Sequence, residues 1–248
     1  MAIAEHTATI AGWLIDPVYG NVSETSEKLK EAGLIQGPRF DSRLCGPTSL
    51  MMVMAKAMKQ QGISLPGLIA GIEDIVKRVV PKTHYTVHRE LTKGVDLPNL
   101  LEAIKLEFEQ VGIKSVKVQH FSNDLRFPQL KSGDIRDLFV DPCVSLKPND
   151  ALILNISYYK QSDTFDAAKR LGGHYVVVDG RNQADRDLIQ VKDPDYPENI
   201  VTAKLEDFPK GYRGPTYRMD FKTGHLEEQQ RRSHVMTLIS GTAHITWS

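Results

Sequence analysis

Apolar residues in the first half of the chain recur at helical spacing. The pattern predicts three helices, over residues 23–33, 47–62 and 98–112. A serine or a proline, residue types that favour the opening turn of a helix, begins each segment, and a glycine ends or follows it. In the third segment, Leu100 and Ile104 belong to an apolar stripe with charged residues between its members, so this helix is expected to lie at the surface of the fold.

Beyond residue 115 the apolar runs become short and rich in β-branched residues, which is typical of strands. The predicted strands cover residues 115–120, 151–159, 174–179, 188–192 and 236–247, the last interrupted at Gly241. Turn residues between neighbouring strands favour hairpins. Helices followed by hairpin-joined strands predict an α+β fold with an antiparallel sheet, because a doubly wound parallel sheet needs helices that alternate with strands.

Composition narrows the class of protein. The 248 residues are 41% hydrophobic and 25% charged, and 31 basic residues balance 31 acidic ones. This balance argues against nucleic acid or an anionic membrane surface as a partner. No apolar run approaches the roughly 20 residues of a spanning helix, so no membrane insertion is expected. We expect one soluble domain over residues 1–248, either cytoplasmic or secreted as an already processed chain, because the N-terminus lacks a signal-peptide pattern.

Cys45 stands where the helix of residues 47–62 begins. The chain has two cysteines, too few for a disulfide framework or a thiolate metal cage. Pro47 suits an opening turn, and first-turn amides together with the helix macrodipole favour a thiolate at that position. Cys45 is therefore a candidate nucleophile, although a free cysteine also serves as a small buried hydrophobe. Cys143 has neither a helix start nor a basic neighbour, and we interpret it as structural.

His174 begins one predicted strand and Asp193 ends the next. If these strands form a hairpin, the carboxylate comes beside the imidazole and fixes its tautomer, as nucleophilic catalysis by a thiol requires. Each residue taken alone also has a structural interpretation, His174 as a strand-edge histidine and Asp193 as a turn residue. The combination with Cys45 favours the catalytic interpretation.

The other histidines give weaker signals. His84 and His88 have a spacing that suits a metal only on a helix, and the residues around them favour no helix, so we predict no metal site. His225 and His234 flank a charged stretch, residues 227–232, which we interpret as a solvated segment.

Three segments, residues 45–50, 173–178 and 191–194, resemble papain-fold cysteine peptidases related to the bacteriocin-processing (double-glycine leader) peptidases and their stand-alone relatives. The resemblance implies a papain-like fold, with a central helix that starts at the Cys and a C-terminal antiparallel sheet. It also implies the roles of nucleophile, base and orienting carboxylate for Cys45, His174 and Asp193. Its layout extends over about residues 40–210; about 1–35 and 210–248 match nothing in the family and would be family-specific additions.

The chain departs from the family before the cysteine. The family usually has a Gln six residues before its Cys as an oxyanion donor, and this chain has Arg39 there. We consider Gln36, Arg39 and Ser42 as replacements, alongside the Cys45 amide. Leu44 also replaces the usual Asp or Asn, and a double-glycine specificity is not indicated.

The resemblance and the residues together predict a thiol-dependent hydrolase that cleaves a peptide or amide bond through an acyl-enzyme thioester, without metal or organic cofactor. An acyl transferase, transglutaminase or deamidase would use the same triad, and an inactive peptide-binding module would keep the same fold. The expected partner is a peptide or protein substrate. The sequence leaves the oligomeric state open.

Overall fold

The computed structural model describes residues 45–63, 75, 78–81, 94–124, 126, 130, 139, 146–161, 166, 169–178, 188–194, 196–211 and 214–248. The chain forms two compact units. The helical unit comprises Met1–Lys117, Pro194–Glu198 and Thr246–Ser248, and the barrel unit comprises Val118–Asp193 and Asn199–Ile245. Within the described ranges, no helix has the length and apolar character needed to cross a membrane.

Two of the three predicted helices are confirmed, α4 over Cys45–Gln60 and α7 over Leu97–Gln110. The predicted helix of residues 23–33 lies outside the described residues. Both helices are followed by a left-handed glycine, Gly62 at φ 67° and Gly112 at φ 82°. The residue after each glycine then donates its amide to a carbonyl five positions back, at 2.8 and 3.0 Å. This is the Schellman arrangement, which satisfies carbonyls at the end of the helix.

Helix α7 has the amphipathic character that its sequence predicts. Its apolar stripe is buried, with Leu100, Ile104 and Phe108 fully inaccessible. Asp96 caps the first turn by accepting the Asn99 amide at 3.1 Å. The apolar stripe and the Asp96 cap therefore account for the formation of this helix and for the face that it buries.

The end of the chain packs into the helical unit through Trp247, which is 2% exposed. Its indole Nε1 donates to Gln60 Oε1 of α4 at 3.0 Å, and its ring centroid lies 6.0 Å from that of Phe108 on α7. The Lys56 ammonium lies 5.6 Å from the centroid of the same ring, within reach of a cation–π interaction. Trp247 thus contacts both helices at once.

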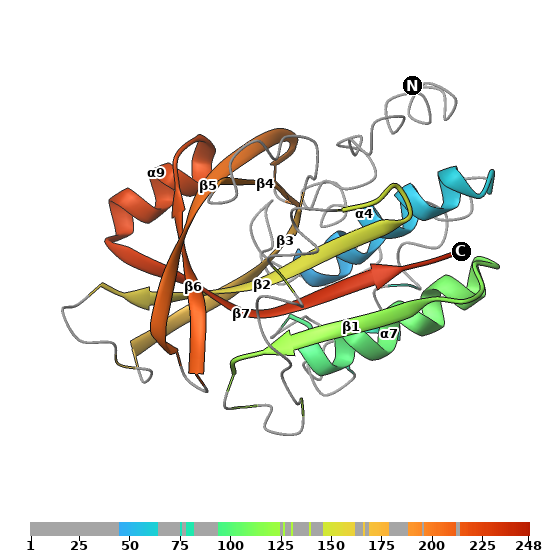
Figure 1. Cartoon of the computed structure of the whole chain (residues 1–248), viewed down its shortest axis with the longest axis horizontal. Helices are drawn as coiled ribbons and strands as arrows, with labels where there is room; N and C mark the ends of the chain where they lie inside the picture. The colour runs from blue at the N-terminus through green and yellow to red at the C-terminus, as the bar shows by residue number, and fades with distance from the viewer. Residues whose placement is uncertain are drawn as a thin grey trace, which may run out of the picture. The chain divides into compact units, whose positions relative to one another are not determined.

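The described strands form one seven-stranded sheet in the order β1-β7-β2-β3-β4-β5-β6, and a further β7–β6 pairing closes six of them into a barrel (Figure 1). The registers within the pairs β2–β3, β3–β4, β5–β6 and β6–β7 are antiparallel. The strands are β1 Lys117–Ser122, β2 Asp150–Lys160, β3 Arg170–Val178, β4 Leu188–Asp193, β5 Tyr196–Gly211, β6 Gly214–Phe221 and β7 Val235–Thr246. The predicted α+β class with an antiparallel sheet is therefore confirmed, whereas closure of the sheet was not predicted.

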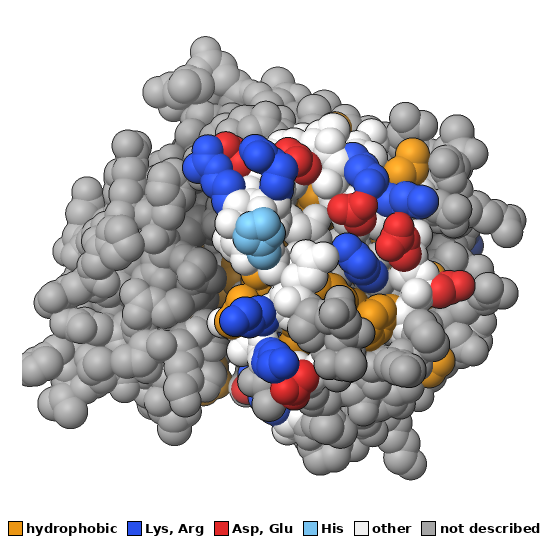
Figure 2. Space-filling view, turned by 90° about the vertical axis from the view of Figure 1, so that its left-hand side faces the viewer, with side chains coloured by type: hydrophobic (Ala, Val, Ile, Leu, Met, Phe, Trp, Pro, Cys, Tyr) orange, Lys and Arg blue, Asp and Glu red, His pale blue; other side chains and the backbone are white. Residues whose placement is uncertain are grey.

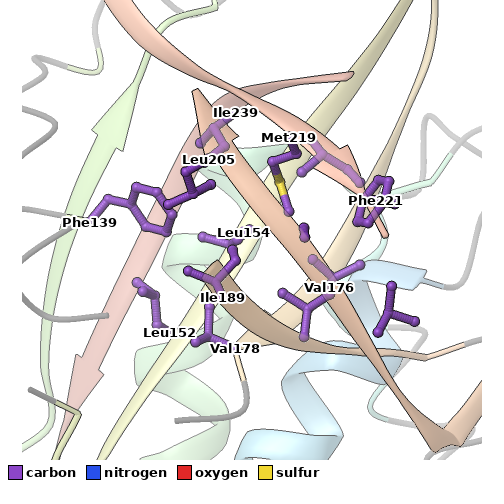
Figure 3. Close-up of a cluster of buried hydrophobic side chains, with 14 of the residues drawn as sticks. Phe139, Leu152, Leu154, Val176, Val178, Ile189, Leu205, Met219, Phe221 and Ile239 are labelled. Carbon is purple, nitrogen blue, oxygen red and sulfur yellow. The ribbon is translucent and has the colours of Figure 1, made fainter. Parts of the chain in front are cut away.

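Alternate residues of the strands fill the barrel. Leu154 of β2, Val176 of β3 and Ile189 of β4 point toward Met219 of β6 in the same cluster of buried side chains (Figure 3). Because successive residues of a strand point to opposite faces, this cluster defines the inward face of each strand. That face also includes His174, two residues before Val176 on β3, and Asp193, four residues after Ile189 on β4.

Helix α9, Gly224–Ser233, follows β6 and packs against it. Residues 227–232 form part of this helix, and each is exposed or partly exposed, as expected of a solvated segment. Two ion pairs at i, i+4 spacing, Glu227–Arg231 and Glu228–Arg232, support the exposed side of α9. The predicted interruption of the last strand at Gly241 is wrong, because β7 continues through this residue.

We predict that Trp247→Ala lowers the free energy of unfolding by about 3–5 kcal/mol, because it removes a large ring that both helices contact. Chemical denaturation followed by circular dichroism measures the loss. Gln60→Ala is the matched control, since it removes the hydrogen bond to the indole and leaves the ring in place, at a cost of about 1 kcal/mol. Equal losses in the two variants would contradict the assignment of the stability to ring packing.

Candidate functional site

Cys45 is the first residue of a helix that is buried on all sides. Fourteen of the 16 residues of α4 are buried, and Cys45 itself is 6% exposed. Its thiol forms no disulfide. The predicted helix start at Cys45 is confirmed, and the amides of the first turn therefore lie next to the sulfur-bearing residue.

Two hydroxyl groups lie one turn after Cys45 on the same helix. Thr48 and Ser49 are both fully buried, and neither side-chain oxygen has a hydrogen-bond partner within the part of the chain that the structure describes. At three and four residues from Cys45, they share its face of the helix, and helical side chains lean toward the N-terminus. Buried polar side-chain atoms normally have a hydrogen-bond partner, either a protein group or an ordered water molecule.

The strand β3 places His174 on the inward face of the barrel. His174 pairs with Ile156 of β2, and directly opposed residues share a face. On the other side, Val178 pairs with Val191 of β4, so that Asp193 continues the register diagonally to His174. The predicted hairpin is therefore confirmed, and so is the contact: His174 Nε2 lies 2.9 Å from Asp193 Oδ1.

Asp193 also binds a second histidine, which the sequence did not reveal. His225 Nε2 of α9 lies 2.8 Å from Asp193 Oδ2. Burial raises the pKa of Asp193, but the charge of His174 and the hydrogen bonds from both imidazoles outweigh it and hold the pKa well below its usual range. The carboxyl is therefore ionised at neutral pH and accepts a hydrogen bond at each oxygen.

An ionised carboxylate has no proton to donate, so both imidazoles donate from Nε2. For His174 this fixes the tautomer. In the neutral ring, Nδ1 is then the nitrogen that accepts a proton. Asp193 thus assigns the role of base to one specific atom of His174.

Helix α9 is held in place by several polar contacts to the barrel. The Gln230 amide donates to the Met219 carbonyl at 2.9 Å and to Thr237 Oγ1 at 3.1 Å, and its oxygen accepts the Phe221 amide at 3.1 Å. Leu226 is buried in the barrel cluster. Leu226 follows His225 directly and Gln230 lies five residues after it, so these contacts hold the turns of α9 that carry His225.

The glycines before His174 differ in their surroundings. A Cβ on Gly173 would lie 2.4 Å from Arg170 Nη2 and 3.1 Å from the Ile156 carbonyl oxygen, whereas one on Gly172 would meet nothing within 4 Å. The Arg170 guanidinium donates from Nε to Ser157 Oγ at 3.0 Å. The side chain of Arg170, from the same strand, thus occupies the space beside Gly173.

The structure brings His174 and Asp193 together in the barrel unit, while Cys45 belongs to the helical unit and its pairing with them stays a prediction. The remaining residues considered from the sequence lie outside the described residues: Gln36, Arg39, Ser42, His84, His88 and Cys143. His234 ends α9 in a left-handed conformation at φ 47°. Among described side chains, no three His, Cys, Asp or Glu residues are grouped to hold a metal ion.

A concavity lies on the barrel unit beside α9. Its volume is about 340 Å³, and its lining combines basic residues such as Arg218 and Arg231 with the acidic residues Asp220 and Glu227. Basic and acidic side chains are likewise interspersed on the face of the molecule in Figure 2. This mixture of charges gives the concavity no preference for an anion or a cation.

Comparisons of this chain with models of known protein families, with curated protein sequences and with solved structures give no match.

We predict that Asp193→Asn lowers the free energy of unfolding at pH 7 by about 1–3 kcal/mol, because an amide cannot accept a hydrogen bond at both positions. Since the pKa of Asp193 is depressed in the folded protein, its stabilisation is complete above the unfolded value of about 3.9 and declines as pH falls below it toward the folded pKa. The advantage of the wild type over the variant should therefore shrink from pH 5 to pH 2. Denaturant titrations at several pH values measure it, and an advantage that stays constant over this range would contradict an ionised Asp193.

We also predict that Gly173→Ala destabilises the protein by about 1–3 kcal/mol, whereas Gly172→Ala is near neutral. The Cβ at Gly173 forces the Arg170 guanidinium and the neighbouring β2 carbonyl to move, and the Cβ at Gly172 enters open space. Thermal and denaturant unfolding of the two variants compare adjacent positions of one strand. Similar stabilities of the two variants would show that the position of the Arg170 side chain does not require a glycine at residue 173.

Proposed function

We propose that this protein is a thiol-dependent hydrolase that cleaves a peptide or amide bond with Cys45 as nucleophile, His174 as base and Asp193 as orienting carboxylate. The observation that carries the proposal is the buried His174–Asp193 hydrogen bond, found between two residues that the sequence had paired with Cys45. The start of a buried helix at Cys45 adds to it. We further propose that the α+β architecture is a form of the papain-like fold.

The first half of the reaction forms a thioester. The Cys45 thiol gives its proton to Nδ1 of His174, and the thiolate attacks the carbonyl carbon of the substrate. When the tetrahedral intermediate collapses, the carbon–nitrogen bond breaks and the imidazolium returns the proton to the leaving amine. The acyl group stays on the Cys45 sulfur.

Water completes the reaction. His174 takes a proton from the water molecule as its oxygen attacks the thioester, and the carbon–sulfur bond then breaks. The carboxylic acid product leaves, and the proton on His174 returns to the Cys45 sulfur. Neither half requires a metal ion or a redox partner.

Asp193 supports the charge that appears on His174 in both halves. A buried carboxylate that is ionised stabilises an imidazolium at 2.9 Å, and its depressed pKa keeps it from taking the proton. The developing oxyanion needs separate donors. The Cys45 amide is one candidate, and Gln36, Arg39 and Ser42 remain the candidates from the sequence.

We predict that Cys45 reacts rapidly with iodoacetamide at about pH 5–6, and that His174→Ala slows this reaction at the same pH. The thiolate requires the imidazolium as its counterion at acidic pH, and the variant lacks it. Rates from pH 4 to 9 are read by peptide mass spectrometry, with Cys143 in the same sample as the internal reference.

Turnover gives the second measurement. A peptide library should be cleaved by the wild type, and Cys45→Ala should abolish the cleavage. A Cys45 alkylation rate that rises only near pH 8.5 and is unchanged in His174→Ala would contradict the proposal. It would favour a peptide-binding module of the same fold. Products that carry an added amine in place of water would redirect the assignment to acyl transfer.

A further inference from the structure

We propose that His225 is a positioning residue for this site: it holds the second oxygen of Asp193 and, through the carboxylate, fixes the ring orientation and the tautomer of His174. The inference rests on the proposed function for its catalytic meaning. Its structural content depends only on contacts within the barrel unit, where His225 Nε2 lies 2.8 Å from Asp193 Oδ2.

Each of the two histidines donates a hydrogen bond to a different oxygen of the Asp193 carboxylate. Oδ1 accepts from His174 and Oδ2 accepts from His225, so the carboxylate plane is set by donors on different elements, β3 and α9. Donors at both oxygens restrict rotation about the Cβ–Cγ bond, and this rotation sets the direction of the hydrogen bond to His174. With both in place, the direction of the bond to His174 is fixed.

The exposure of the three side chains gives His225 a second role. The side chains of Asp193 and His174 are 1% and 6% exposed, whereas that of His225 is 23% exposed. His225 therefore reaches from the buried carboxylate to the surface and excludes water from Oδ2. A buried carboxylate needs such a donor, because an ion without hydrogen-bond partners in the interior is strongly disfavoured.

The start of α9 is built so that His225 meets Asp193. Gly224 has a φ of 77°, which favours glycine, and a Cβ there would lie 3.1 Å from Val201 Cγ2. The Thr223 hydroxyl accepts the Thr202 amide at 2.9 Å, which ties the residue before the helix to β5. The first turn of α9 thus approaches the barrel closely, and its second residue is His225.

The charge distribution favours the same role. Two N–H donors make the carboxylate a weaker proton acceptor than one donor would. Asp193 then remains an anion when His174 carries the proton from Cys45. If His225 were absent, Asp193 would be a stronger proton acceptor, and one of its buried oxygens would lose its donor.

The test uses two variants of the full chain and one control. His225→Phe keeps a planar ring and removes both nitrogens. His225→Gln places an amide donor near the position of the imidazole Nε2. His234→Asn is the matched control: it replaces the histidine at the other end of α9 with a residue that tolerates the left-handed conformation found there.

The primary readout is the nitrogen-15-coupled proton signal of His174 Nε2, assigned by its loss in His174→Ala. We expect this signal to shift or broaden in His225→Phe, to stay near its wild-type position in His225→Gln, and to be unchanged in His234→Asn. The second readout is the Cys45 alkylation rate at pH 5–6, which should fall in His225→Phe, because a displaced His174 no longer supports the thiolate, and recover in His225→Gln.

The outcomes separate this inference from the proposed function. If His174→Ala leaves the Cys45 alkylation rate unchanged, the proposed function fails. The His174 signal alone then decides the role of His225. A wild-type signal in His225→Phe overturns the inference, as does an equal change in the Phe and Gln variants. If His225→Phe does not fold, His225→Gln decides: retention of the signal supports the inference, and its loss contradicts it.

Discussion

The burial of an ionised carboxylate is the constraint on which this site depends. Asp193 is fully removed from water at the end of β4, and two imidazole N–H groups that bond its two oxygens stabilise its charge there. The two donors come from different elements, His174 from β3 and His225 from α9. The barrel therefore has to bring β3, β4 and α9 to one point, and the closed sheet order is the means by which it does so.

The two donors reach Asp193 by routes of very different sequence separation. His174 lies 19 residues before Asp193 and arrives through one antiparallel hairpin, in which the register alone sets the pairing. His225 lies 32 residues after Asp193, and β5 and β6 lie between them in the chain. The His174 contact is thus local to a hairpin, whereas the His225 contact requires most of the barrel. A site that uses both is coupled to the integrity of the whole sheet.

This difference explains what could be predicted from the sequence. The helix that starts at Cys45, the hairpin and the His174–Asp193 contact follow from caps, alternation and register, which are properties of short segments. The strands β5 and β6 were not predicted, although Val201, Ala203 and Leu205 alternate with polar residues, which is the pattern of a half-buried strand. Helix α9 escaped because Leu226 is its only buried residue, although the repeated Glu-to-Arg spacing at i, i+4 is a helical signal. The contact of His225 has no signal in its own segment.

The same reasoning shows why the carboxylate, rather than either histidine, is the centre of the arrangement. An imidazole in contact with water keeps its hydrogen bonds when a protein partner is lost, because solvent replaces it. A carboxylate at 1% side-chain exposure has no such replacement, so each lost donor leaves a buried charge partly unsatisfied. His225, at the surface, is the member that can be changed with the least disturbance of packing, and Asp193 is the member whose environment records the change. The geometry of His174 depends on that environment, since Asp193 fixes which of its nitrogens carries the proton.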